Sequence, residues 1–304
     1  MRRGAWGHAW AVGDAVRGAR AGQTCWHLPR HEQWVWDGTP LAGRRVLVRC
    51  YHGLGDTLMF ARFVPPLRAV AAEVTLWAQP ALLPLLATMR GVGPLLPLHD
   101  DAPAVPYDVD VEAMELAHAL RATPATLPPP PQFDVAPAAL PDDGRLRVGV
   151  VWECGDWDRS TRSIPLPLLA PLAAVPGVAL HVLQRGTALA DALARPSFGA
   201  ASGSDDVLEA ARVVRALDLV VTIDSFPAHL AGALGVPVWT LLPHAADWRW
   251  MDDGDGSPWY PTMRLFRQAR PGDWAGVVGR VAGELALLVT ERDAKREARR
   301  AVSS

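Results

Sequence analysis

Residues 217–242 (LDLVVTIDSFPAHLAGALGVPVWTLL) contain two apolar runs separated by a polar turn and a segment of small residues. Apolar runs rich in β-branched residues are typical of buried strands in a parallel sheet. Asp224 and Ser225 end the first run. Pro227 suits the first turn of a helix, where an N–H is not needed, and Gly235 ends that helix. The stretch therefore predicts a strand, a tight turn, a short helix and a second strand, which is a unit of α/β folds.

The turn after the first of these strands is a place where α/β proteins bind anions. The N–H groups at the start of the helix face the carboxyl end of the strand, and phosphate is the usual ligand there. Asp224, Ser225 and His229 cluster at this turn. Because Ser or Asp at such a turn is often only a helix cap, the turn by itself leaves both interpretations open.

Strands and helices alternate over most of the 304 residues. The predicted strands are residues 45–50, 73–77, 107–111, 146–152, 179–183, 217–223, 236–242 and 263–266, and the predicted helices follow residue 57 and cover 80–89, 166–172, 205–216, 228–234 and 274–288. Proline-rich residues 127–132 (LPPPPQ) and 137–144 predict a stiff extended linker between two such series. We therefore predict an α/β protein with two Rossmann-like domains, residues 43–141 and 142–304, which face each other across a cleft.

The two ends of the chain carry different predictions. Residues 1–42 show no clear period, and we predict an extended N-terminal arm that is packed through its tryptophans. Residues 274–288 have apolar side chains at helical spacing and predict a C-terminal helix of the second domain. Residues 291–304 are charged and predict a solvated, frayed helix end.

Composition excludes several classes of protein. The formal net charge of −2 argues against binding of nucleic acid. The three cysteines lie far apart, and neither H-E-x-x-H nor a Walker lysine motif occurs, so a disulfide framework or a dedicated metal site lacks support. The N-terminus has no secretory signal, and no apolar run approaches the roughly 20 residues of a membrane helix. These features predict a cytoplasmic protein without stable membrane insertion.

The polar groups of the first domain centre on residues 53–57 (GLGDT), which follow its first strand. Gly53 and Gly55 let the backbone turn sharply and let a ligand approach closely. Asp56 begins a helix, where it could cap the helix or accept a proton from a hydroxyl that attacks a bound electrophile. The dinucleotide fingerprint G-x-G-x-x-G is incomplete here, because Leu58 occupies its last position.

Three polar segments of the second domain are predicted at the same cleft. Residues 152–164 carry Arg159 and Arg162 beside hydroxyl groups, and a guanidinium fork suits a diphosphate. The same arginines could instead pair with acidic neighbours in a surface loop. Residues 184–186 (QRG) follow another strand, and the many aromatic residues of 244–260 are typical of a lid or a packed plug.

Taken together, these motifs resemble glycosyltransferase family 9, the ADP-heptose:lipopolysaccharide heptosyltransferases. The sequence looks closer still to the glycosyltransferase domain found behind tetratricopeptide repeats in bacterial proteins. The resemblance covers residues 36–288 and rests on a combination of short motifs: 53–57 (GLGDT), 162–166 (RSIPL), 183–186 (LQRG), 224–235 (DSFPAHLAGALG), 247–250 (DWRW) and 257–261 (SPWYP).

The resemblance implies a GT-B fold, with an acceptor domain followed by a nucleotide-sugar domain. It implies inverting transfer of a hexosyl or heptosyl group from a nucleotide-diphosphate sugar, such as an ADP-heptose-like donor, to a glycan, lipid-linked or protein acceptor, without a metal or other cofactor. Asp56 is implied to be the catalytic base. The implied substrate-binding residues are Gly53, Gly55, Thr57, Arg162, Ser163, Gln184, Arg185, Gly186, Asp224, Ser225, Ala228, His229, Trp248 and Arg249.

Several residues depart from the family pattern. His52 and Met59 flank the first turn, Phe226 and Pro227 replace a small or flexible pair, and Ser225 stands where threonine is common. These departures motivate an alternative, a catalytically degenerate module that binds a sugar nucleotide or a glycan. A nucleotide-sugar epimerase on the same fold is a third hypothesis, but it would need acid and base residues near the donor sugar that the sequence does not identify.

Overall fold

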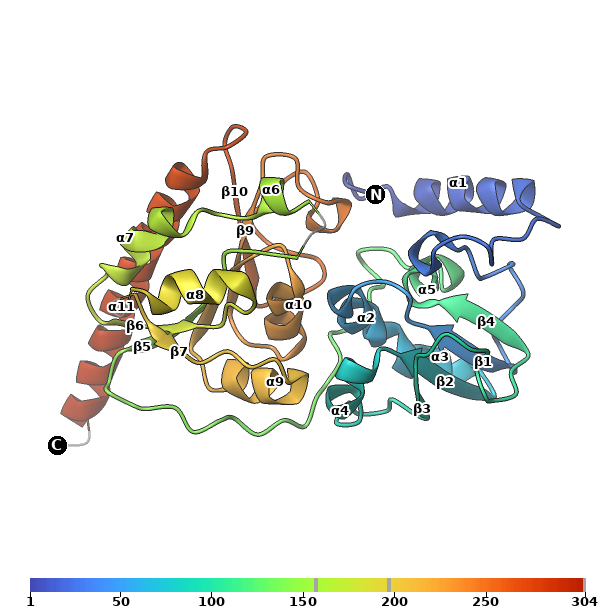
Figure 1. Cartoon of the computed structure of the whole chain (residues 1–304), viewed down its shortest axis with the longest axis horizontal. Coiled ribbons are helices and arrows are strands. Elements are labelled where there is room, and N and C mark those ends of the chain that lie inside the picture. The colour runs from blue at the N-terminus through green and yellow to red at the C-terminus, as the bar shows by residue number, and fades with distance from the viewer. Residues whose placement is uncertain (156–157, 196–197, 303–304) are drawn as a thin grey trace.

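The computed structural model describes residues 1–155, 158–195 and 198–302, and contains two parallel sheets flanked by helices (Figure 1). The strand order is β3-β2-β1-β4 in the four-stranded sheet and β10-β9-β8-β5-β6-β7 in the six-stranded sheet. The two sheets come from the first and the second half of the chain. The predicted arrangement of two α/β units is therefore confirmed.

The first sheet lies at the centre of the N-terminal half. Its strands are β1 (Arg45–Arg49), β2 (Glu73–Ala78), β3 (Leu95–Pro97) and β4 (Val109–Glu112). Val46 of β1 lies opposite Val74 of β2 and Val109 of β4. The helices are α2 (Leu54–Phe60), η2 (Ala61–Phe63), α3 (Val64–Val70), η3 (Pro80–Leu82), α4 (Leu83–Leu86), η4 (Ala113–Glu115) and α5 (Leu116–Ala119). Pro65 and Pro66 begin α3 rather than break a helix, because proline is tolerated in a first turn.

The second sheet is wider. Its strands are β5 (Leu146–Val150), β6 (Val178–Val182), β7 (Ala200–Ala201), β8 (Leu219–Ile223), β9 (Val238–Leu242) and β10 (Met263–Arg267). The helices are α6 (Arg159–Arg162), η5 (Leu166–Leu169), α7 (Ala170–Ala173), α8 (Thr187–Leu193), α9 (Val207–Arg215), α10 (Phe226–Ala233), η6 (Trp248–Trp250) and α11 (Trp274–Val302). The unit predicted over residues 217–242 is confirmed as β8, α10 and β9, and all five residues of β8 are buried.

The prediction of an irregular N-terminal arm is wrong for part of its length. Residues 6–19 form the helix α1 (Trp6–Ala19), and a single 3₁₀ turn, η1 (Arg30–Glu32), follows. Trp6 is 1% exposed and stacks on Trp259, with ring centroids 5.2 Å apart. The only buried side chain of α1 is Trp6, so the helix has no apolar face that the sequence could reveal. Contacts with distant aromatic residues hold it in place.

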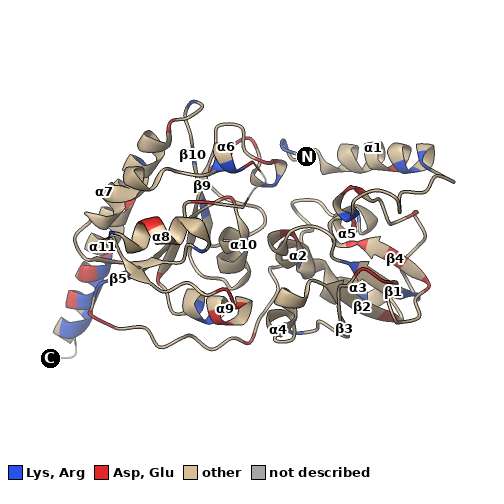
Figure 2. Cartoon of the chain, viewed as in Figure 1, with Lys and Arg blue, Asp and Glu red and all other residues tan. Residues whose placement is uncertain are grey.

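The prediction of a frayed C-terminal end is also wrong within the described residues, since α11 continues to Val302. Its basic residues gather near that end (Figure 2). Arg292 and Arg296 both donate hydrogen bonds to the Gly144 carbonyl, so the helix end is tied to the start of the second sheet. Over the described ranges, no helix combines the length and apolar character needed to cross a membrane.

Helix α2 of the first half packs against α10 of the second half. A Cβ at Gly55 would lie 2.6 Å from Cδ2 of His229 in α10. On the same helix, a Cβ at Gly232 would lie 2.5 Å from Cγ of Tyr260. Real Cβ atoms do not approach so closely, so glycine is what permits both contacts. The small residues of α10 therefore serve close packing, and this packing places the two polar turns side by side.

We expect Gly232→Ala to lower the free energy of unfolding by about 1–3 kcal/mol, because the added methyl overpacks the contact with Tyr260. Gly283→Ala is the matched control, since a Cβ there meets nothing within 4 Å in α11. Alanine is favoured over glycine in a helix by about 1 kcal/mol, so this control should be stabilised. Urea unfolding of both variants measures the difference, and equal midpoints would contradict the packing described here.

Candidate functional site

Asp56 lies in the first turn of α2, where the chain leaves β1. Its Oδ2 accepts a hydrogen bond from the Gly53 N–H at 3.1 Å. Its Oδ1 lies 2.5 Å from Nη2 of Arg249, which belongs to η6 in the second half of the chain. The candidate base and a guanidinium from opposite domains therefore form an ion pair.

Arg249 is held on several sides. Its Nη1 donates to Oδ1 of Asp247 at 2.8 Å, and its carbonyl accepts from the Trp259 indole N–H at 2.9 Å. The side chain is 14% exposed. Burial opposes the positive charge, but the charges of Asp56 and Asp247 outweigh it and raise the pKa of Arg249. The guanidinium is therefore permanently charged, and it lies at the boundary between the two domains.

The ring of His229 packs against Gly55, which directly precedes Asp56 in the first turn of α2. Its ring stacks on Trp250 with centroids 5.4 Å apart, and its Nδ1 lies 3.1 Å from the Tyr260 hydroxyl. Burial lowers the pKa of His229 to about 4, although the nearby charge of Asp56 acts in the opposite direction. The imidazole is consequently neutral at physiological pH and can offer a hydrogen bond but no charge.

Asp224 directly follows β8, and Arg162 at the end of α6 reaches its backbone. Nη1 of Arg162 donates to the Asp224 carbonyl at 2.9 Å, which ties the loop after β5 to the turn before α10. The Asp224 side chain is buried, and burial raises its pKa against the opposing effects of Trp250 and Arg162. The charges of Asp247 and Arg249 also act on Asp224, so this carboxyl adjoins the Asp56 cluster.

The start of α10 offers an anion fewer N–H groups than the sequence suggested. Ser225 is the N-cap residue, and its hydroxyl lies 3.4 Å from the Ile223 carbonyl. Pro227 has no N–H, and the N–H of the buried Ala228 donates to the Ser225 carbonyl at 3.0 Å. The positive charge near this turn therefore comes mainly from arginine side chains.

Other predicted site residues hold loops together. Oε1 of Gln184 accepts from the N–H groups of Trp152 and Glu153 at 3.1 and 3.0 Å, joining the loops after β5 and β6. Arg185 pairs with Asp205, with Nε 2.9 Å from Oδ1. These side chains have partners within the protein, so their contacts explain them without a ligand.

The remaining predicted residues are more scattered. The Ser163 hydroxyl accepts from the Cys154 N–H at 3.3 Å, and Gly186 has a φ of +72° before α8. Thr57 lies on the inner side of α2, where its hydroxyl donates to Oε1 of Gln79 at 3.1 Å. Trp248 meets Trp6 and Trp259 edge to face. The structure thus gathers Asp56, Asp224, His229 and Arg249, with Arg162 attached through Asp224.

Four residues around this cluster were not predicted as site residues. Trp250 and Tyr260 pack on His229, and both lie in the aromatic segment that was interpreted as a lid or plug. Arg62 is 2% exposed and donates to the carbonyls of Met59, Pro128 and Trp259. A lone arginine inside the apolar run MFARFV was the available signal. Glu112, the fourth residue, lies 3.0 Å from Nδ1 of His52, the residue singled out above as a departure.

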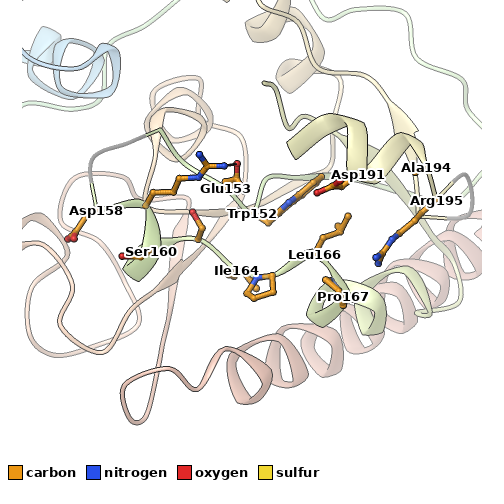
Figure 3. A pocket seen from close by; sticks show the side chains of 13 residues that line it. Trp152, Glu153, Asp158, Ser160, Ile164, Leu166, Pro167, Asp191, Ala194 and Arg195 are labelled. Atoms are coloured by element: carbon orange, nitrogen blue, oxygen red, sulfur yellow. Dashed lines mark hydrogen bonds and ion pairs between the residues drawn. The ribbon is translucent and has the colours of Figure 1, made fainter. Parts of the chain in front are cut away.

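The larger of the two cavities described, about 990 Å³, lies away from this cluster. It lies between the loop after β5 and helix α8, with Trp152, Leu166 and Asp191 among its lining residues (Figure 3). Of the predicted residues it includes Ser163, whereas Asp56, Asp224 and His229 are not among its lining residues. Asp56, whose side chain is 23% exposed, therefore meets Arg249 outside the larger cavity.

We expect His229 to make stability depend on pH. Its pKa is about 4 in the folded chain against 6.5 for an unperturbed histidine, so the unfolded chain binds more protons between these values. Between pH 7.5 and pH 5, which covers about 1.5 pH units of this window, the free energy of unfolding should drop by about 2 kcal/mol. Urea unfolding of the wild type and His229→Gln at pH 7.5 and pH 5 measures it.

The comparison between these two proteins isolates His229. Burial raises the pKa of Glu115 to about 7, which gives the opposite slope, but this effect is common to both and cancels. His8→Gln changes an exposed histidine of α1 and is the matched control. A stability difference between wild type and His229→Gln that stays constant with pH would rule out a buried neutral imidazole.

Comparison with curated sequences gives one informative relative. No family model matches the chain. Protein FlbA of Caulobacter vibrioides is 26% identical over an alignment of 290 positions that covers 82% of this chain and 48% of FlbA. The chain thus spans about half the length of this curated relative.

Solved structures give a clearer result for the fold. The glycosyl transferase family 9 structure from Veillonella parvula DSM 2008 has a TM-score of 0.62 at 12% identity, over 83% of this chain and 99% of that one. E. coli ADP-heptose lps heptosyltransferase II has a TM-score of 0.57 at 16% identity, over 82% and 99%. E. coli heptosyltransferase WaaC with ADP-2-deoxy-2-fluoro heptose has 0.54 at 16%, over 79% and 99%.

At these identities the likeness establishes the fold. The closer resemblance to domains that follow tetratricopeptide repeats stays a prediction, because none of these similarities bears on it. The two parallel sheets and the shared architecture with family 9 enzymes confirm the GT-B prediction. The chain is a GT-B protein, structurally similar to the glycosyltransferases of family 9.

Proposed function

We propose that the protein is an inverting glycosyltransferase that moves a hexosyl or heptosyl group from a nucleotide-diphosphate sugar to an acceptor hydroxyl. The observation that supports it best is the ion pair of Asp56 and Arg249, which joins the two domains. A carboxylate on the acceptor side that faces a cation on the donor side suits deprotonation of a nucleophile and stabilisation of a leaving diphosphate. The heptosyltransferase neighbours make an ADP-heptose-like donor the first candidate.

In the proposed reaction, Asp56 accepts the proton of the acceptor hydroxyl while the hydroxyl oxygen forms a bond to the anomeric carbon of the donor sugar. The bond from that carbon to the diphosphate breaks, and the electron pair leaves with the diphosphate. Arg162 and Arg249 stabilise the charge that develops there. His229 contributes a hydrogen bond at most, because its imidazole is neutral.

We propose that this reaction needs no metal ion or other cofactor. The arginines beside Asp224 and Asp56 supply positive charge where other transferases use a divalent cation. For the other residues that the resemblance implies, substrate binding stays a proposal, and Gln184 and Arg185 would have to exchange their present partners to take part in it. The acceptor, whether a glycan, a lipid-linked sugar or a protein, remains a broad class, and a cytoplasmic location remains a prediction.

A second candidate function is a module that binds a sugar nucleotide or a glycan without turnover. The ion pair of Asp56 with Arg249 favours it, since the carboxylate proposed as the base already has a cationic partner in this structure. Phe226 and Pro227 favour it too, because proline removes a donor from the helix that would receive the diphosphate. Binding without turnover separates this candidate from the transferase.

We expect one class of nucleotide sugar to raise the melting temperature. Sugars linked to ADP, UDP, GDP, CMP and dTDP are each tested with magnesium and with EDTA. A ligand at a hundred times its dissociation constant adds about 2.7 kcal/mol of stability, which gives a shift of several degrees. A selective shift that persists in EDTA is the expected result. A folded protein that responds to none of them would argue against both candidate functions that involve a nucleotide.

We expect Asp56→Asn to lower the rate of transfer roughly 10²–10⁴-fold, because general-base catalysis contributes about that factor. Binding of the nucleotide should survive, since the base lies on the acceptor side. Asp110→Asn is the matched control, because Asp110 forms an ion pair with Arg49 within the first sheet. Product formation is followed by mass spectrometry. Undiminished transfer by Asp56→Asn would exclude this residue as the base.

A further inference from the structure

We propose that Arg249 is a latch on Asp56 that the donor diphosphate opens. In the free protein Arg249 pairs with Asp56, and on donor binding the diphosphate takes over the guanidinium, so that Asp56 becomes able to receive the acceptor proton. This inference rests on the proposed transferase function. It assigns Arg249 a positioning role toward the base, in addition to donor binding, and it makes the donor the first substrate to bind.

The hydrogen bonds of Asp56 support the closed state of the latch. Oδ2 is taken by the Gly53 N–H of its own helix cap, and Oδ1 is taken by Arg249. The acceptor hydroxyl must reach one of these oxygens to transfer its proton. A carboxylate oxygen can accept more than one hydrogen bond, so the acceptor need not displace both partners. Because the cap bond fixes the carboxylate to the start of α2, the Arg249 contact is the one that a ligand can exchange.

The guanidinium is incompletely bonded in this state. Nη1 is bound to Asp247 and Nη2 to Asp56, but the buried Nε–H has no hydrogen-bond partner among the described residues. A buried donor without a partner is unfavourable, because it has lost its hydrogen bond to water and gained none in the protein. A diphosphate has several acceptor oxygens and can accept hydrogen bonds from Nε and from an Nη of the same guanidinium. It can therefore replace Asp56, which offers Arg249 a single carboxylate oxygen.

The surroundings favour movement of the side chain over movement of its backbone. The Arg249 carbonyl is held by the Trp259 indole, and Trp259 stacks on Trp6. Arg162, the other group proposed to bind the diphosphate, donates a hydrogen bond to the carbonyl of Asp224. The charge of Arg249 acts on the pKa of the Asp224 carboxyl, so both arginines lie near this residue. In the proposal, the Arg249 side chain rotates away from Asp56 and joins Arg162 at the diphosphate.

A latch of this kind has a measurable thermodynamic consequence. If Asp56 and the diphosphate compete for one guanidinium, then removing the charge of Asp56 must strengthen nucleotide binding. An arginine that binds the diphosphate without being held by Asp56 would show no such gain. A residue with a merely structural role would lose affinity when its partner is removed.

Titration calorimetry with ADP, and in parallel with UDP and GDP, tests this consequence. We expect Asp56→Asn to bind the preferred nucleotide about fivefold more tightly than the wild type, the lower end of typical coupling between sites. Arg249→Ala should bind it more weakly, and Asp56→Asn combined with Arg249→Ala should show no gain over Arg249→Ala. Asp110→Asn should match the wild type. If Arg249→Ala does not fold, Arg249→Gln replaces it, because glutamine keeps part of the side chain and removes the charge.

The outcomes separate the latch from the function on which it rests. Unchanged or weaker binding by Asp56→Asn, with a wild type that binds, overturns the latch and leaves the transferase intact. A gain that persists in the Arg249→Ala background also overturns it, because the gain would then arise elsewhere. Failure of the folded wild type to bind any of the three nucleotides overturns the proposed function and the latch together.

Discussion

The packing of α2 against α10 is the contact on which the candidate site depends. Glycine at 55 admits the ring of His229, and glycine at 232 admits the ring of Tyr260. Both rings are buried, so α10 meets α2 through the His229 ring and meets the loop before β10 through the Tyr260 ring. Asp56 follows Gly55 directly, and it therefore reaches the second domain as a consequence of this packing.

Two buried arginines lie at this contact, and their bonding differs. Arg62 donates to three carbonyls from three separate segments, which holds α2, the linker and the loop before β10 together. Arg249 leaves its buried Nε without a partner among the described residues, while Nη1 bonds to Asp247 and Nη2 to Asp56 and the Met114 sulfur. A satisfied buried cation favours a fixed structure, whereas an unsatisfied one favours exchange of partners. The first suits a support and the second suits a group that meets a ligand.

Apolar runs located most of the fold from the sequence, because buried parallel strands such as β1 and β8 are continuous and hydrophobic. The short edge strand β3 was missed, since only three residues form it and none is buried. For the site, the rule that ligands bind at the carboxyl ends of parallel strands predicted Asp56 and the turn before α10. The pairing of Asp56 with Arg249 was beyond reach, because 193 positions separate them and only the packed fold brings them together.

Helix α1 bears on how a ligand could enter. Its Trp6 stacks on Trp259 of the second domain, while its Trp10 donates to the Ala122 carbonyl and its Asp14 pairs with Arg121 in the first. A wide separation of the domains would have to break one of these sets of contacts, including a tryptophan that is 1% exposed. Rotation of a single arginine side chain breaks one ion pair and leaves α1 in place. Local exchange at Arg249 is therefore the less costly route to an occupied site.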